Sequence, residues 1–100
     1  MLEELIDDVR RWGKEKGILI NGNPVAQSKK FLEEAGEVML AVGADNDLEI
    51  MDGIGDTIVT LIMLTELKEM TLYECLLSAY NEIKDRKGKM VNGTFVKEIG

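Results

Sequence analysis

Histidine is absent from this sequence, and Cys75 is its single cysteine. Zinc sites built from cysteine and histidine, catalytic triads that use histidine and imidazole proton shuttles are therefore excluded. An intrachain disulfide is excluded too, and the setting of Cys75 in TLYECLLSAY predicts an inert, buried position on a helix. Any chemistry has to use carboxylates, amides and lysines.

Aromatic residues make up only 5% of the chain and proline occurs once, whereas 45% of the residues are apolar. An aliphatic, methionine-rich core is typical of helix bundles rather than of β-sandwiches. We therefore expect an all-α, four-helix bundle-like fold in a single domain that spans residues 1–100. A domain this small leaves much of its apolar surface thinly covered, which favours a homo-oligomer.

Basic residues are scarce as well, because 12 lysines and arginines stand against 19 aspartates and glutamates, a formal charge of −7. Nucleic acids are bound by basic surfaces, so this charge argues against a nucleic-acid partner. A nucleotide can still be bound through a metal ion. The acidic start MLEELIDD and the lack of a membrane-length apolar run predict no signal peptide, no membrane partner and a cytoplasmic location.

Apolar residues spaced three and four apart predict four helices. These cover residues 2–16, 24–43, 48–68 and 71–86. Asn23 before Pro24 and Thr71 are typical helix N-caps, and the GILINGNP stretch predicts a loop. The third helix is almost continuously apolar, so we expect it to be buried on most sides. The pair Asn92-Gly93 between short apolar runs predicts a hairpin or extended arm.

Acidic residues cluster on the second predicted helix, where Glu33, Glu34 and Glu37 form an EExxE pattern. Glu33 and Glu37 stack one turn apart, Glu34 lies beside them, and Lys30 joins the same side. Most acidic clusters on helices are solvated surfaces, so this pattern alone is weak evidence of a site.

The third predicted helix adds Glu49, Asp52 and Asp56, which fall within an arc of roughly 60°. Charges in a mostly buried helix are costly unless they are paired or bound to metal, and few lysines are near. Two facing acid clusters suit Mg²⁺, which prefers carboxylate and water oxygens and often bridges protein to substrate phosphates. The pattern favours a metal site over structural ion pairing.

Three motifs follow one another along the chain: Gln27-x-x-Lys30-x-x-Glu33-Glu34-x-x-Glu37, a GxGD element ending at Asp56, and Asn81-x-x-Lys84. Together they resemble the MazG-like branch of the all-α NTP pyrophosphatases. The stretches RRWGKEKGI and GKMVNGTFVK are similar to the compact, often phage-encoded members, so the resemblance covers nearly the whole chain. It implies Mg²⁺-dependent hydrolysis of a nucleoside triphosphate to the monophosphate and pyrophosphate, with Mn²⁺ as a substitute, in a homotetramer or dimer.

The metal ligands implied by the resemblance are Glu34, Glu37 and Asp56, with Glu33 also at the metal or polarising water. The chain departs from the family at Gly53, which replaces an acid three residues before Asp56. Asp52, one full turn before Asp56, can supply the missing acid.

A literal ExxD motif also exists at Glu49 and Asp52, so two registers are possible on this helix. We favour the GxGD register, because the apolar run follows Asp56 directly.

Phosphate contacts are implied for Lys30, Asn81 and Lys84. Lys84 also fits an ordinary basic helix end that is favoured by the helix dipole. Trp12, the single tryptophan, can stack on a base, although a tryptophan on an amphipathic helix is more often a core residue.

Two readings from other classes compete with the enzyme. In one, the chain is a non-catalytic helical interaction module whose acidic surfaces keep an oligomer in solution. In the other it buffers divalent cations, which is weaker because no EF-hand loop occurs. The sequence leaves the preferred base and sugar open.

Overall fold

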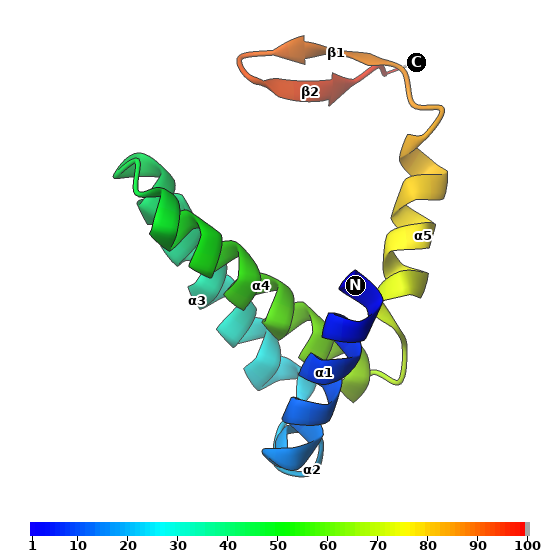
Figure 1. Cartoon of the computed structure of the whole chain (residues 1–100). Coiled ribbons are helices and arrows are strands. Elements are labelled where there is room, and N and C mark those ends of the chain that lie inside the picture. Colours follow the sequence, from blue (N-terminus) through cyan, green and yellow to red (C-terminus); the bar gives the residue numbers. More distant parts are fainter. Residues whose placement is uncertain (100) are drawn as a thin grey trace.

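A computed structural model describes residues 1–99, and it is mainly helical with a small antiparallel sheet. The elements in chain order (Figure 1) are α1 (Leu2–Glu15), α2 (Ile18–Asn21), α3 (Pro24–Gly43), α4 (Asp47–Leu67), α5 (Leu72–Ile83), β1 (Gly88–Val91) and β2 (Thr94–Lys97). The four predicted helices are confirmed. The loop predicted for GILINGNP is wrong in part, because α2 forms one helical turn there. The last helix ends at Ile83, three residues earlier than predicted.

Side-chain caps fix where three of the helices begin, as the sequence predicts for Asn23 and Thr71. Asn23 accepts a hydrogen bond from the Ala26 amide at 2.9 Å, Asn46 from the Glu49 amide at 3.2 Å and Thr71 from the Glu74 amide at 3.1 Å. Each cap satisfies an amide that has no partner within its own helix. The starts of α3, α4 and α5 are therefore set by local chemistry.

The helices α3 and α4 form an antiparallel pair joined by a short turn, in which Asp45 has a φ of 52°. They approach closely where Gly53 of α4 lies against Val38 of α3. A Cβ atom at position 53 would lie 2.9 Å from Val38 Cγ2, so only glycine fits without a shift. The Gln27 side chain also donates a hydrogen bond to the Thr60 carbonyl at 3.3 Å, which ties the two helices together further along.

The core lies at the second half of α4, where Ile62 and Met63 are almost fully buried. Gly13 of α1 packs against the Met63 side chain. An ion pair between Arg10 and Glu66 joins α1 to α4. The first half of α4 is exposed in a single chain, with Leu48 at 75%, so the prediction that this helix is buried on most sides is wrong. Within residues 1–99, one chain provides no element to cover that half.

The last helix leaves the body of the molecule, since α5 contacts only the end of α4 within residues 1–99. The hairpin β1–β2 beyond it contacts none of the described helices (Figure 1). Its register pairs Met90 with Phe95, and the turn residues Asn92 and Gly93 have φ values of 49° and 87°. Positive φ at both positions is the tight hairpin turn that Asn-Gly favours, so this prediction is confirmed.

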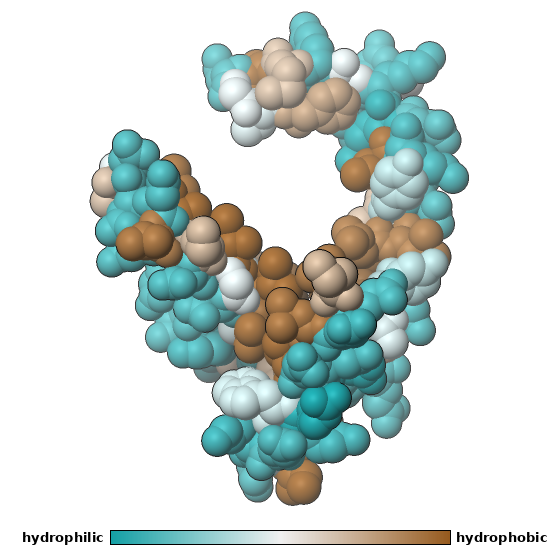
Figure 2. All heavy atoms as spheres, viewed as in Figure 1, coloured by the Kyte–Doolittle hydropathy of each residue, from teal (hydrophilic) through white to brown (hydrophobic). Residues whose placement is uncertain are grey.

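The molecule is open and curved. The radius of gyration is 15.9 Å, against about 13 Å for a compact domain of this length. The accessible surface is 8113 Å², whereas a compact monomer of this mass exposes about 5,700 Å². Figure 2 shows apolar residues gathered along the inner side of the curve. No helix in residues 1–99 is both long enough and apolar enough to cross a membrane.

Candidate metal site

A groove of about 490 Å³ runs between α3 and α4 near the turn that joins them. Its acidic side chains are Glu37 on α3 and Glu49, Asp52 and Asp56 on α4. Of the three acids predicted on α3, Glu37 alone shares this groove with the acids of α4. Ala41, Ala44 and Gly53 also line it. Sequence reasoning missed the two alanines, whose small size at a spacing of three leaves the room.

Glu34 is the buried acid of the cluster, with a side chain only 11% exposed. Its Oε1 atom lies 3.3 Å from the Lys30 ammonium nitrogen. Its Oε2 atom is buried and accepts no hydrogen bond from residues 1–99. A buried carboxylate oxygen without a donor is costly, because it loses hydration and gains nothing in exchange. A cation is one kind of partner that the chemistry of this oxygen fits.

Glu37 lies one turn after Glu34 and shares its electrostatic environment. Coulombic repulsion by Glu34 raises the pKa of Glu37, and partial desolvation and the charge of Glu33 raise it further. The hydrogen bond to Glu34 is the main reason that the pKa of Lys30 is also raised. The pair therefore holds more negative charge than its one lysine neutralises, and a bound cation would relieve the repulsion.

Glu33 is exposed on α3 and does not line the groove. Its charge still reaches the cluster, because it contributes to the raised pKa of both Lys30 and Glu37. It lies beside the acid cluster rather than in it.

Glycine stands at position 53, where the family that the sequence resembles has an acid, and the structure gives a reason for this difference. This position faces α3 at the close approach to Val38, and a carboxylate there would force the two helices apart. Asp52 and Asp56, one turn apart, both line the groove, and so does Glu49. Both registers proposed from the sequence thus place their acids at the same groove.

No three acidic side chains within the described part of the chain converge closely enough to hold a metal ion as they stand. The acids on α4 are exposed, so their side chains are free to rotate toward the Glu34–Glu37 pair. What the structure does bring together is the exposed Glu37 on one wall and the carboxylates of α4 on the facing wall. The buried Glu34 lies one turn before Glu37 and does not line the groove.

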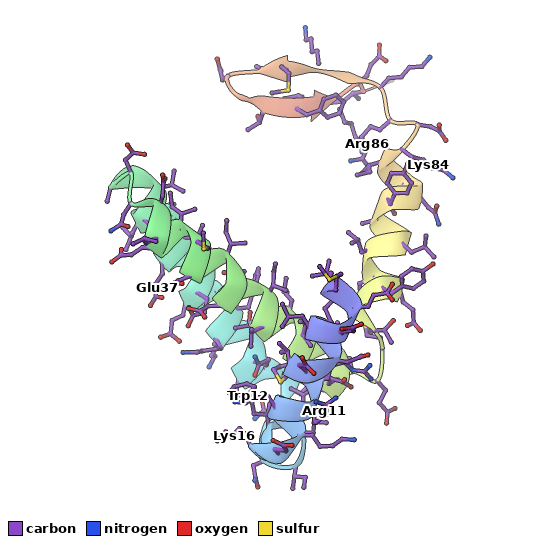
Figure 3. The ribbon with its side chains drawn as sticks, viewed as in Figure 1. Arg11, Trp12, Lys16, Glu37, Lys84 and Arg86 are labelled. Carbon is purple, nitrogen blue, oxygen red and sulfur yellow. The ribbon has the colours of Figure 1, made fainter. Side chains whose placement is uncertain are left out.

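The predicted substrate-binding residues outside α3 lie away from the groove. Asn81 and Lys84 are exposed at the end of α5, and Figure 3 shows Lys84 on the opposite limb of the molecule from Glu37. Trp12 does not line the groove either, and at 45% exposure it is not the core residue that was the alternative. Cys75 is exposed, so its predicted burial is wrong for a single chain. Trp12 and Cys75 therefore lie on surfaces that another element or another chain could cover.

Comparison with known proteins adds one phage relative. No protein-family model matches the chain, and no solved structure matches it. The chain is 29% identical over 65 residues to a protein of Haemophilus phage HP1 (strain HP1c1), described as an uncharacterized 18.2 kDa protein in the rep-hol intergenic region. The match covers 65% of this chain and 40% of the phage protein. The chain therefore corresponds to less than half of that relative, whose description states no activity.

Proposed function

We propose that the chain is a Mg²⁺-dependent nucleoside triphosphate pyrophosphohydrolase of the MazG-like type, which acts as a homo-oligomer on nucleotides of the cytoplasm. The Glu34–Glu37 pair carries this proposal. One buried oxygen of Glu34 lacks a donor, and repulsion between the two acids raises the pKa of Glu37. A divalent cation would satisfy that oxygen and favour the charged form of both groups.

The donor set fits magnesium, because every side chain involved offers a hard oxygen ligand. Glu37, Asp52 and Asp56 line the groove and would hold the ion there. The buried Glu34, one turn before Glu37, would add a ligand from α3. Manganese prefers the same ligands and would substitute. The resemblance to the family supports the same assignment.

When bound, Mg²⁺ supplies a water of lowered pKa and neutralises charge on the triphosphate. In the proposed reaction the oxygen of a water molecule would bond to the α-phosphorus while the bond to the bridging oxygen breaks, so that pyrophosphate leaves and the monophosphate remains. We assign to Glu33, exposed beside the cluster, the role of accepting the proton of the attacking water. Lys30 would turn from Glu34 toward a phosphate oxygen once Glu34 holds the cation.

The exposed apolar surface supports the homo-oligomer. The accessible surface of 8113 Å² exceeds that of a compact monomer by about 2,400 Å². A typical stable dimer buries about 800 Å² on each partner, so this excess is ample for an interface. A dimer, or a tetramer of two dimers as in the resembling family, would complete the helical bundle that one chain leaves open. A stable monomer at micromolar concentration in light scattering would rule out both.

Turnover of the four dNTPs and dUTP, with and without Mg²⁺, tests the reaction directly. We expect equal amounts of monophosphate and pyrophosphate, and only with the metal. The variant Asp56→Asn should abolish turnover while its circular dichroism is unchanged, because the amide keeps the shape and removes the charge. Orthophosphate release without pyrophosphate would contradict the proposed reaction.

The register on α4 is decided by a matched pair of variants. If the GxGD register is right, Asp52→Asn weakens Mg²⁺ affinity by at least about 10- to 100-fold, because loss of a direct ligand is at least as damaging as loss of a residue that supports one. The variant Glu49→Gln should have little effect. If Glu49→Gln and Asp52→Asn together destroy Mg²⁺ binding while Asp56→Asn retains full activity, the ExxD register is right.

A second candidate, the non-catalytic interaction module, is favoured by the same exposed apolar surface. It requires no metal. Titration calorimetry with Mg²⁺ separates the two candidates, since a module predicts no saturable binding that depends on Glu34 and Glu37.

A further inference from the structure

The hairpin and the residues that lead into it form a basic arm, defined here as residues 84–97. It carries one acid, Asp85, and five basic residues, which are Lys84, Arg86, Lys87, Lys89 and Lys97. None of these five forms an ion pair with residues 1–99. Within the same residues the hairpin packs on no helix, and at its base the Glu98 amide bonds to the Lys87 carbonyl at 2.8 Å.

The rest of the molecule has the opposite charge. Residues 1–83 contain seventeen acidic and seven basic side chains, a net charge of −10, whereas the basic arm has +4. Between Lys30 and Lys68 there is no lysine or arginine at all, and this stretch includes every acid of the groove. The two charges are thus separated into two parts of the structure, and the acidic part has too few cations of its own.

The hairpin also exposes apolar side chains that need a partner. Met90 and Phe95, which face each other across the two strands, are 66% and 51% exposed. A two-stranded hairpin with nothing packed against it is marginally stable in water. The groove offers a matching apolar residue at its edge, because Leu40 of α3 is 71% exposed.

We propose that the basic arm of one copy of this chain docks on the acidic α3–α4 groove of a second copy and brings lysine and arginine to that site. Within one chain, Figure 3 places Lys84 and Arg86 on one limb and Glu37 on the other. The accessible surface is larger than that of a compact monomer, which independently favours association with a second copy. Exchange of the arm buries the hairpin and neutralises the acids in one contact.

The inference rests on the proposed function in one respect: the docked cations would contact the triphosphate bound beside the acids of the other copy. Each site would then take its acids from one chain and basic residues from its partner, so an isolated chain would have an incomplete site. Substrate phosphates would lie between the cation-binding carboxylates and the arm, where charge-assisted hydrogen bonds are strongest.

Disulfide trapping tests the arm without any activity measurement. In a Cys75→Ser background, the chain receives Leu40→Cys in the groove and Lys89→Cys in the arm. Mild oxidation should give covalent dimers on a non-reducing gel. The yield should fall in 1 M salt, where screening shortens the Debye length to about 3 Å. The control replaces Leu40→Cys by Lys16→Cys, at the end of α1 away from the groove.

Three outcomes would overturn docking in trans. These are a monomer that closes an internal disulfide, no disulfide at all, and equal trapping at position 16. The single-cysteine variants show separately whether two equivalent positions meet across a symmetry axis. None of these readouts depends on hydrolysis, so the arm can be tested even if the proposed reaction fails.

Mixing two inactive variants links the arm to the site. One variant is Asp56→Asn, which has an intact arm. The other variant carries three substitutions in the arm, Arg86→Gln, Lys87→Gln and Lys89→Gln. We expect these three together to lower turnover about tenfold or more. In a mixed dimer with exchanged arms, one site has both an intact groove and an intact arm, so an equal mixture recovers about a quarter of wild-type activity. No recovery beyond the sum of the separate variants, when mixed dimers have formed, would refute exchange.

Discussion

Replacing Gly53 by alanine tests the close approach of α3 and α4 that shapes the groove. The added Cβ would lie 2.9 Å from Val38 Cγ2, with the Val38 Cα atom 3.6 Å away. Valine is branched at Cβ and has little freedom to turn aside, and the backbone of α3 is directly behind it. The helices must therefore move apart.

The magnitude follows from two opposing effects. Overpacking a tight contact costs about 1–3 kcal/mol. Alanine in a helix interior is favoured over glycine by about 1 kcal/mol, which offsets part of this cost. We therefore expect Gly53→Ala to lower the free energy of unfolding by about 0–2 kcal/mol, the difference of these two ranges.

Gly55, two residues along the same helix, is the matched control, because a Cβ there meets nothing within 4 Å. Gly55→Ala should raise the free energy of unfolding by about 0.5–1 kcal/mol. Urea unfolding followed by circular dichroism, at one fixed protein concentration, measures both variants. If Gly53→Ala is as stable as Gly55→Ala, the two helices are not in the contact described, and the explanation for the missing acid at position 53 is wrong.

Other predictions concern charge. Since Glu34 raises the pKa of Glu37, the native state binds that proton more tightly than the unfolded chain. The proton on Glu37 therefore stabilises the native state fully below the ordinary glutamate pKa of 4.5. This stabilisation is lost as the pH rises through the raised pKa of Glu37. Glu37→Gln should therefore unfold at a higher temperature than wild type at neutral pH without divalent ions, and adding Mg²⁺ should stabilise wild type alone; a lower melting temperature would contradict the repulsion. Arg10→Ala should cost about 1 kcal/mol, because the pair with Glu66 joins two helices, whereas Arg11→Ala, whose pair lies within α1, should cost less than about 0.5 kcal/mol. Equal losses in thermal melts would show that the Arg10 pair does not hold α1.

Local signals in the sequence predicted most of the secondary structure. Asn23, Asn46 and Thr71 cap their helices, and Asn92-Gly93 makes the turn expected of it, because each feature depends on a few neighbouring residues. Helical periodicity also sets which side chains share a face, and Glu49, Asp52 and Asp56 of α4 line one groove together with Glu37.

Burial could not be predicted in the same way. Trp12, Cys75 and the first half of α4 all have the apolar setting of core positions, yet each is exposed in one chain. The hydrophobic pattern indicates that a side chain becomes buried, but it does not indicate whether its own chain or a second chain buries it. The direction that α5 takes, and with it the distance of Lys84 from the groove, depends on a loop at Glu69 with a φ of 56°, which no periodic signal specifies.

The short turn between α3 and α4 has a consequence for the order of folding. Because these two helices are adjacent in the sequence, their contacts close small loops and should form early, within one chain and at a rate independent of concentration. The exposed half of α4 and the basic arm can be covered only after two molecules meet. Refolding should therefore show a fast phase that gains helix, followed by a slower phase whose rate rises with protein concentration.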